Sequence, residues 1–264
     1  MGSSPVAVTA VIAAAGSGQR LGAGGPQAFV PLAGKAMIEW SIEAFGAAEP
    51  VRSIVVACPP GHAPGLGGEG LTVVDGGEAR AESVANALEA VDTELVAIHD
   101  AARPLVTAEL VEAVIAMLCA DPEADGAIAA TPVTDTIKQV GAGKQVGKRE
   151  EAGGEGSKDL STSFGPHRVL KSSTDVETTL DRGRLWAAQT PQVFRTEALR
   201  AAIDAAESAA ASGGGVAAAT DEAMLIEEAG GRVLIYPSLP ENLKVTTPLD
   251  LKMAELLLNE RSAQ

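Results

Sequence analysis

The sequence predicts an α/β protein with a doubly wound, mostly parallel β-sheet. Short apolar segments alternate with helical segments along most of the 264 residues, as expected for repeated β-α-β units. The first apolar segments are nearly all apolar, which is typical of parallel strands covered on both faces. Hydrophobic residues make up 46% of the chain, enough for a substantial core, although aromatic residues make up only 3%. In sheets of this kind, ligands bind beyond the carboxyl ends of the strands.

The individual elements follow that alternation. Apolar segments predict strands at Val6–Ile12, Ser53–Ala57, Leu71–Val74, Leu95–His99, Gly126–Thr131 and Arg232–Tyr236. Helical segments are predicted at Met37–Ala47, Arg80–Val91, Ala108–Ala120, Thr196–Ala211, Asp221–Ala229 and Leu249–Asn259. Two helix starts carry capping signals, Thr107 before the third helix and Thr247-Pro248 before the last.

One stretch departs from this pattern. From Lys138 to about Thr174 the chain is polar and rich in Gly, Lys and Glu, so it buries little surface. We interpret it as a mobile insertion or an extended arm. The sequence therefore predicts an α/β domain made of residues 1–137 and 190–264, and a partly flexible arm at residues 138–189.

Charge and composition exclude several classes of partner. The formal net charge of −15 argues against a nucleic-acid partner, which requires a basic face. No apolar run reaches the ~18 residues of a membrane span, and the N-terminus lacks the basic flank of a signal peptide. Cys58 and Cys119 lie in apolar surroundings without metal-ligand spacing. We interpret them as buried, reduced thiols of a cytoplasmic protein with no membrane partner.

The segment Val8–Arg20 is the first candidate site. An apolar strand leads into the small-residue loop at residues 13–18, and Arg20 follows that loop. Small residues let the backbone approach a phosphate chain, and an arginine grips the same anion with its planar fork of donors. The loop lacks the third glycine of a dinucleotide fingerprint and the Lys-Ser/Thr of a P-loop. An ordinary strand-to-helix turn is the alternative.

The segment Asp75–Ser83 is the second candidate site, because it follows a strand and opens a helix. Gly76 and Gly77 leave room for a base or a ribose. Arg80 and the serine that ends the segment lie in the first helical turn, which has free N–H donors. A tight turn with a solvated arginine is the alternative.

The segment His99–Pro104 is the third candidate site. An acid directly after a buried strand is costly unless it binds a cation or pairs with a base. Asp100 is therefore suited to holding Mg²⁺ between nucleotide phosphates, and Arg103 to steadying a neighbouring anion. An internal ion pair between Asp100 and Arg103 is the alternative. We expect His99 to orient the loop by hydrogen bonding.

Six motifs occur in order along the chain: AAAGSGQR, DGGEARAES, HDAARP, LWAAQTPQVF, TDEAMLIE and NLKVTTPLDL. Together they resemble the 2-C-methyl-D-erythritol 4-phosphate cytidylyltransferase family, from about Val6 to Leu258 except for the insertion. The resemblance implies a Rossmann-like nucleotidyltransferase fold with a protruding dimerisation arm, and a homodimer. It also implies CMP transfer from CTP to 2-C-methyl-D-erythritol 4-phosphate, with Mg²⁺ and release of pyrophosphate, in non-mevalonate isoprenoid biosynthesis.

The resemblance also implies roles for residues at matching positions. Residues at the nucleotide are Ala14, Ala15, Gly16, Gly18, Gly77, Arg80 and Ser83, with Asp100 on Mg²⁺. Residues at the acceptor are Arg103, Thr136, Arg182, Thr190 and Lys244. The catalytic set is Arg20, Gln27, Arg182 and Lys244. Because the arm exchanges contacts across a dimer in this family, Thr136 and Arg182 are expected to serve the partner's site.

Gln27 departs from the family pattern, which has a lysine at this position touching the CTP phosphates. Loss of a charged donor at a developing anion costs about 2–4 kcal/mol, or about 10²–10³ in rate. The substitution either weakens the enzyme, is compensated by Lys35 or a residue of the insertion, or marks a changed role. Two other functions therefore stay open: a ribitol 5-phosphate (or other polyol phosphate) cytidylyltransferase, and a non-catalytic nucleotide-binding homologue.

Overall fold

The chain divides into two compact units, each described by itself. One contains residues 1–131 and 187–264, and the other contains residues 132–186. The domain boundaries predicted from the sequence, after residues 137 and 189, stay a prediction. A computed structural model describes residues 6–16, 21, 25–62, 65–140, 175–211 and 221–262.

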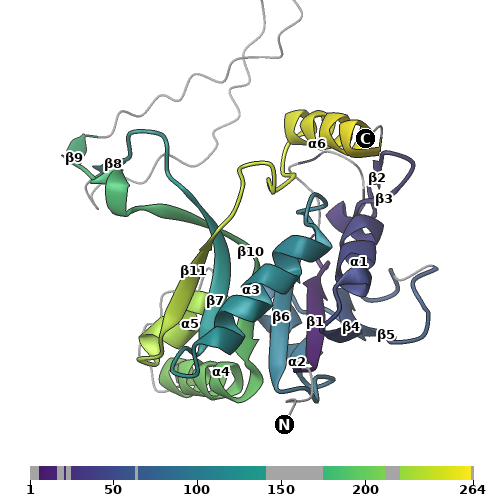
Figure 1. The fold of residues 1–264 in the computed structure, drawn as a ribbon, viewed down its shortest axis with the longest axis horizontal. Coiled ribbons are helices and arrows are strands. Elements are labelled where there is room, and N and C mark those ends of the chain that lie inside the picture. Colours follow the sequence, from purple (N-terminus) through teal and green to yellow (C-terminus); the bar gives the residue numbers. More distant parts are fainter. Residues whose placement is uncertain are drawn as a thin grey trace, which may run out of the picture. The chain divides into compact units, whose positions relative to one another are not determined.

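The first unit is built on a seven-stranded sheet with the order β11-β7-β10-β6-β1-β4-β5 (Figure 1). The pairs β1·β4, β1·β6, β4·β5 and β7·β11 are parallel, whereas β10 runs antiparallel to β6. The mostly parallel sheet predicted from the sequence is therefore confirmed. The strands are β1 (Val8–Ala13), β4 (Val51–Cys58), β5 (Leu71–Asp75), β6 (Leu95–Asp100), β7 (Gly126–Pro132), β10 (Trp186–Arg195) and β11 (Val233–Pro237).

Six helices accompany the sheet in the part of the chain that the structure describes. They are α1 (Met37–Ala47), α2 (Arg80–Leu88), α3 (Ala108–Ala120), α4 (Thr196–Ala211), α5 (Glu222–Glu228) and α6 (Pro248–Ser262). Thr107 caps α3 as predicted, because its side chain accepts a hydrogen bond from the Leu110 N–H at 3.3 Å. Thr247 caps α6 as predicted, because its hydroxyl accepts from the Asp250 N–H at 3.2 Å.

Buried apolar side chains cover both faces of the sheet. On one face, Phe45 of α1 and Leu118 of α3 share a cluster with Ile12 of β1. On the other face, helices α2, α4 and α5 share a second cluster, in which Leu199 of α4 lies with Val11 of β1. Since Val11 and Ile12 are consecutive, they point to opposite faces, and the strand is buried on both sides. This double covering is the physical reason for the uninterrupted apolar runs.

Helix α6 belongs to a third apolar cluster. Its Leu258 is grouped with Leu32 of a short hairpin, β2 (Pro31–Leu32) and β3 (Lys35–Ala36). Ala33 and Gly34 have φ angles of 48° and 93°, the positive values that a tight two-residue hairpin turn requires. The hairpin and the short 3₁₀ helix η1 (Gln27–Phe29) before it were not predicted from the sequence.

The second unit contains a two-stranded antiparallel sheet, β8 (Lys138–Val140) and β9 (Val176–Thr179), followed by the 3₁₀ helix η2 (Arg182–Arg184). All residues of both strands are exposed. Most of the predicted mobile insertion, residues 141–174, lies outside the described residues. The dimerisation arm therefore stays a prediction.

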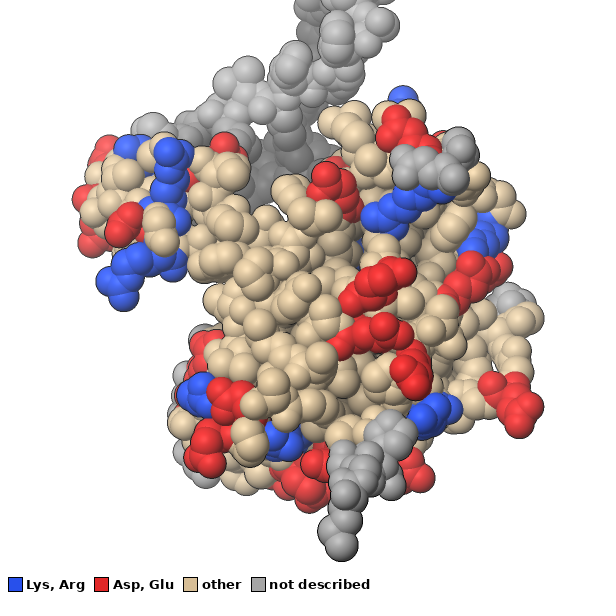
Figure 2. All heavy atoms as spheres, viewed as in Figure 1, with Lys and Arg blue, Asp and Glu red and all other residues tan. Residues whose placement is uncertain are grey.

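The surface and the cysteines bear on three sequence predictions. Figure 2 shows acidic side chains gathered on the side of α1 and α3, as the negative net charge requires. Among the described residues, no helix is long and apolar enough to cross a membrane. Cys58 is buried as predicted, and desolvation raises the pKa of its thiol to about 11. The prediction for Cys119 was wrong: its side chain is exposed, because it lies on the outer face of α3.

Candidate active site

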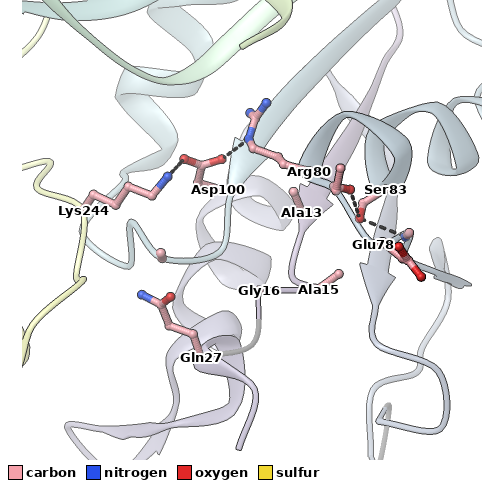
Figure 3. A pocket seen from close by; sticks show the side chains of 12 residues that line it. Ala13, Ala15, Gly16, Gln27, Glu78, Arg80, Ser83, Asp100 and Lys244 are labelled. Carbon is pink, nitrogen blue, oxygen red and sulfur yellow. Dashed lines mark hydrogen bonds and ion pairs between the residues drawn. The ribbon is translucent and has the colours of Figure 1, made fainter. Parts of the chain in front are cut away.

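The carboxyl ends of β1 and β6 and the start of α2 surround a cavity of about 400 Å³ (Figure 3). The cavity lies where parallel α/β sheets bind ligands. It brings together the three candidate segments that were identified from the sequence. Its lining consists of Ala13, Ala15, Gly16, Gln27, Gly77, Glu78, Ala79, Arg80, Ser83, Asp100, Ala102 and Lys244.

The loop after β1 forms one wall of the cavity. Ala15 and Gly16 line it, as predicted. Ala14 is buried, and its N–H donates to the Ala57 carbonyl at 2.9 Å, so this donor is used at the edge of the sheet. The Ala14 N–H is therefore already bonded within the sheet, and the place of Ala14 at the nucleotide stays a prediction. Gly18 and Arg20 lie outside the described residues.

The loop before α2 forms the opposite wall. The N–H of Gly76 donates to the Cys58 carbonyl at 2.6 Å. A Cβ atom at Gly76 would lie 2.5 Å from the Cβ of Ala15, so only glycine lets the two walls approach this closely. The Ser83 hydroxyl accepts from the Gly77 N–H and donates to the Ala79 carbonyl, both at 3.0 Å. Ser83 therefore shapes the turn at the base of the cavity.

A row of alternating charges crosses the cavity wall. The Asp100 carboxylate accepts from Arg80 Nε at 2.8 Å through Oδ1 and from Lys244 Nζ at 2.7 Å through Oδ2, as Figure 3 shows. Arg80 Nη1 also donates to both carboxylate oxygens of Glu222, at 2.6 and 2.8 Å. The expected alternative, an ion pair between Asp100 and Arg103, is replaced by these partners.

The charges in this row set one another's protonation. Burial alone would raise the pKa of Asp100, but the positive charges of Arg80 and Lys244 outweigh it and hold the pKa well below its usual range. Desolvation of Glu222 raises its pKa, against the opposing effect of Arg80. Burial would lower the pKa of Arg80, but its two carboxylate partners raise it. Asp100 and Arg80 are consequently charged at neutral pH.

A second cavity, of about 230 Å³, shares Arg80, Asp100 and Lys244 with the first. The predicted acceptor residues Arg103 and Thr190 line it. Its other lining residues are Ala188, Gln189, Gln192 and Asp221. The Arg103 guanidinium donates to the Asn242 carbonyl at 2.7 Å and to the Ala188 carbonyl at 3.3 Å, so the backbone holds it in place.

His99 holds two residues that line this second cavity, Thr190 and Arg103. Its ring is fully buried, with Nδ1 2.9 Å from the Thr190 hydroxyl and Nε2 3.2 Å from the Arg103 carbonyl. The Thr190 hydroxyl also accepts from the Asp100 N–H at 3.1 Å. Desolvation lowers the pKa of His99 to about 3, so the ring is neutral at neutral pH. His99 orients the loop by hydrogen bonding, as predicted.

Gln27 lies at the mouth of the first cavity and joins two loops. Its backbone N–H donates to the Gly16 carbonyl at 3.1 Å, and its side-chain amide donates to the Val245 carbonyl, next to Lys244. Lys35, considered as a substitute for the family lysine, pairs with Glu43 and has its ammonium 3.6 Å from the centre of the Trp40 ring. Because these contacts occupy its ammonium, we do not expect Lys35 to replace the family lysine at the nucleotide phosphates.

Two predicted residues belong to the second unit. Arg182 donates to the Thr134 carbonyl at 2.6 Å there, and Thr136 lies in the same unit. Their proposed service to a partner's site stays a prediction.

Sequence reasoning assigned no role at the site to three acidic residues. Glu78 lines the first cavity, Asp221 lines the second, and Glu222 pairs with Arg80. Glu222 stands in the TDEAMLIE motif, but a glutamate at a helix start is also explained by its favourable interaction with the helix dipole.

A mostly parallel sheet with a cavity of about 400 Å³ at the carboxyl ends of its strands, lined by a small-residue loop and by paired charges, is typical of nucleotide-binding α/β enzymes. The sequence profile of 2-C-methyl-D-erythritol 4-phosphate cytidylyltransferase matches residues 8–155 and 168–260. The chain belongs to that family.

Individual relatives agree with this assignment. A protein of Symbiobacterium thermophilum with the family's name is 37% identical, and the match covers 98% of this chain and 96% of the relative. The crystal structure of the Thermus thermophilus protein with that name is similar with a TM-score of 0.69 and 29% identity, covering 97% of this chain and all of that one. The Francisella tularensis structure gives a TM-score of 0.72 and 27% identity, covering 95% and 99% of the two chains.

Proposed function

We propose that this protein transfers CMP from CTP to 2-C-methyl-D-erythritol 4-phosphate and releases pyrophosphate. The observation that carries this proposal is the pair of cavities that meet at Arg80, Asp100 and Lys244. One has walls of small residues and glycine suited to a nucleotide, and the other has Arg103 and Thr190 suited to a phosphorylated alcohol. The names of the relatives support the same substrates.

The reaction is a displacement at the α-phosphorus of CTP. An oxygen of the acceptor phosphate forms the new P–O bond, and the bond to the pyrophosphate oxygen breaks. The acceptor phosphate is already ionised at neutral pH, so no general base is required. Catalysis then consists of holding both molecules in line and stabilising the charge that develops on the α-phosphoryl oxygens. Lys244 lines both cavities, which supports its proposed contact with both phosphates. Arg20, Gln27 and Arg182 complete the proposed catalytic set.

Asp100 is the proposed ligand of Mg²⁺. Magnesium in nucleotide sites is bound by one or two carboxylates together with phosphates, and each Asp100 oxygen keeps a lone pair beyond its one cationic partner. Among the described residues, no group of three or more His, Cys, Asp or Glu side chains is arranged to hold a metal ion. A site completed by the nucleotide's own phosphates fits both observations. When bound, the metal neutralises phosphate charge.

Assembly and location are also part of the proposal. The second unit is proposed as a dimerisation arm, with Thr136 and Arg182 reaching the acceptor in the partner's site. The reduced thiols favour the cytoplasm.

The test measures pyrophosphate release with CTP, Mg²⁺ and a panel of acceptors. We expect turnover with 2-C-methyl-D-erythritol 4-phosphate and none without an acceptor. A preference for ribitol 5-phosphate would overturn the acceptor assignment. CTP binding in calorimetry without turnover on any polyol phosphate would favour the non-catalytic alternative. The similarity of the chain to the named family, and its retained site charges, speak against both outcomes.

A further inference from the structure

Glu222 is a buried carboxylate whose role is not explained by the proposed substrate contacts. It is the first residue of α5, and its side chain is only 2% exposed. Both of its oxygens accept hydrogen bonds from Nη1 of Arg80, at 2.6 and 2.8 Å. A buried carboxylate that is paired in this way binds its partner strongly, because either charge left alone would be poorly solvated.

The backbone beneath Glu222 is held in place from two sides. Asp221 caps α5, since its Oδ1 accepts from the Met224 N–H at 3.1 Å. Its Oδ2 accepts from the Gln192 side chain of β10 at 2.9 Å, and Gln192 is almost fully buried. Leu225 of the same helix packs in the apolar cluster on the sheet. Glu222 is therefore a fixed point that holds the long side chain of Arg80.

Arg80 is shared between two carboxylates. Nε contacts Asp100 and Nη1 contacts Glu222, while Nη2 has no protein partner among the described residues. An arginine with only one carboxylate neighbour tends to form a two-point pair with it. Without Glu222, the guanidinium would turn fully onto Asp100 and compete there with any other cation. The ion pair with Glu222 therefore keeps the Arg80 guanidinium from turning fully onto Asp100.

We propose that Glu222 is a positioning residue, which anchors Arg80 at the cavity wall so that Arg80 binds only one oxygen of Asp100 and leaves the carboxylate accessible to a metal-bound nucleotide. This inference rests on the proposed function, because that function assigns Arg80 and Asp100 to the nucleotide. It adds a residue that touches neither substrate and acts through Arg80.

The variant Glu222→Gln keeps the size of the side chain and removes its charge. Glu228→Gln is the matched control, because it makes the same change at an exposed position of the same helix. Calorimetry with CTP alone is expected to show a Kd roughly tenfold higher for Glu222→Gln than for the wild-type protein. The Mg²⁺ concentration that gives half-maximal CTP binding is also expected to rise. The KM for the acceptor and all values for Glu228→Gln are expected to stay at wild-type values.

A double-variant cycle separates positioning from a general structural effect. If Glu222 acts through Arg80, the double variant Arg80→Gln/Glu222→Gln has the same Kd for CTP as Arg80→Gln alone. Fold-changes that multiply in the double variant would overturn the proposal, as would an unchanged Kd and Mg²⁺ requirement in Glu222→Gln. If Glu222→Gln does not fold, Glu222→Asp is tested instead. This variant keeps the negative charge on a side chain that is shorter by one methylene group. A smaller rise in Kd is then expected, and an unchanged Kd would overturn the proposal.

The two proposals fail in different ways. A wild-type protein that neither binds CTP nor releases pyrophosphate would remove the proposed function itself. A wild-type protein that does both, with a Glu222→Gln variant that matches it, would remove only the role of Glu222.

Discussion

Gln27 gives the site a neutral amide where the family pattern has a charged side chain. The structure shows what the amide does instead: it donates to the Val245 carbonyl and so ties the loop after β1 to the loop that carries Lys244. A lysine side chain is one atom longer, and we expect its ammonium to reach a nucleotide phosphate in the cavity that Gln27 lines. We therefore expect lysine at position 27 to exchange the contact with the Val245 carbonyl for a contact with the substrate.

The variant Gln27→Lys is expected to raise turnover, by up to about 10²–10³-fold if the missing charge acts on the developing anion. The melting temperature is expected to change little, because Gln27 is only half-buried and the substitution gives up a single side-chain hydrogen bond, to the Val245 carbonyl. Pyrophosphate release measures the first effect and thermal unfolding the second.

Two controls accompany this variant. Gln27→Met removes the amide without adding charge and should not raise turnover. Lys35→Met should leave turnover unchanged, since Lys35 is held by Glu43 and Trp40. Turnover of Gln27→Lys at or below the wild-type rate would show that no charge is missing at this position.

Residue-scale prediction from the sequence succeeded where a side chain acts beside its own motif. Asp100 and Arg80 stand directly after a strand and at a helix start, and both line the cavity. Glu222 received no role from the sequence because its partner Arg80 lies 142 residues away along the chain. No local pattern distinguishes a glutamate in a first helical turn that faces solvent from one that pairs across the fold.

At the scale of elements, hydrogen bonds at the start of α6 hold the loop that carries Lys244. Oδ2 of Asp250 accepts from the N–H and the hydroxyl of Thr246, both at 2.9 Å, and from the Thr247 N–H at 2.8 Å. The Val245 N–H donates to the Ala102 carbonyl at 2.8 Å. These contacts hold the segment that carries Lys244 beside the cavity.

The variant Asp250→Asn is expected to lower the free energy of unfolding by about 1 kcal/mol at neutral pH, as the loss of a helix cap does. Hydrogen bonds from Thr246 and Thr247 lower the pKa of Asp250 in the folded protein. Its stabilising effect is therefore present above the unfolded-state pKa of about 4 and is lost as the pH falls through the folded-state value. Urea unfolding at several pH values should show the difference between variant and wild type shrinking below about pH 4.

The exposed substitution Glu255→Gln on the same helix provides the comparison. It should leave the free energy of unfolding nearly unchanged at neutral pH. A constant difference between Asp250→Asn and the wild type down to low pH would contradict the assigned role of the carboxylate.

Prediction of elements worked best for amphipathic helices. The bounds of α1, α3 and α4 match the sequence prediction to the residue, because apolar periodicity marks these helices and Thr107 also caps the start of α3. Strand β10 was missed, since Gln189, Pro191 and Gln192 are not typical of a buried strand. Its two glutamines are buried because Asn242 and Asp221, from distant segments, supply their hydrogen bonds. Such partners become visible only in the folded protein.

At the scale of the whole molecule, the proposed dimer makes a prediction that a monomer cannot meet. Arg182 lies in the second unit and Lys244 in the first. If each active site combines Lys244 of one protomer with Arg182 of the other, two inactive variants restore one complete site in a mixed dimer. Random mixing of Arg182→Ala and Lys244→Ala chains makes half of the dimers mixed, so about a quarter of wild-type activity is expected.

Co-expression with two different affinity tags isolates the mixed dimer, which has one complete site of two and should reach about half of wild-type activity in the pyrophosphate assay. Each variant purified alone serves as the baseline. Recovery no greater than that baseline would show that both residues act within one chain, and analytical ultracentrifugation of the wild-type protein reports the assembly directly.

The polarity of β10 has an evolutionary consequence. This strand runs against β6, so its first residues, and not its last, arrive beside the tip of β6 where Asp100 stands. The long excursion of the chain leaves the sheet after β7 and re-enters it through β10, only a few residues before Thr190. Insertions and deletions between β8 and β9 therefore do not shift the register of any pairing in the seven-stranded sheet. The strands around the first cavity tolerate such changes of chain length, whereas Thr136 and Arg182 lie outside the segment that can vary.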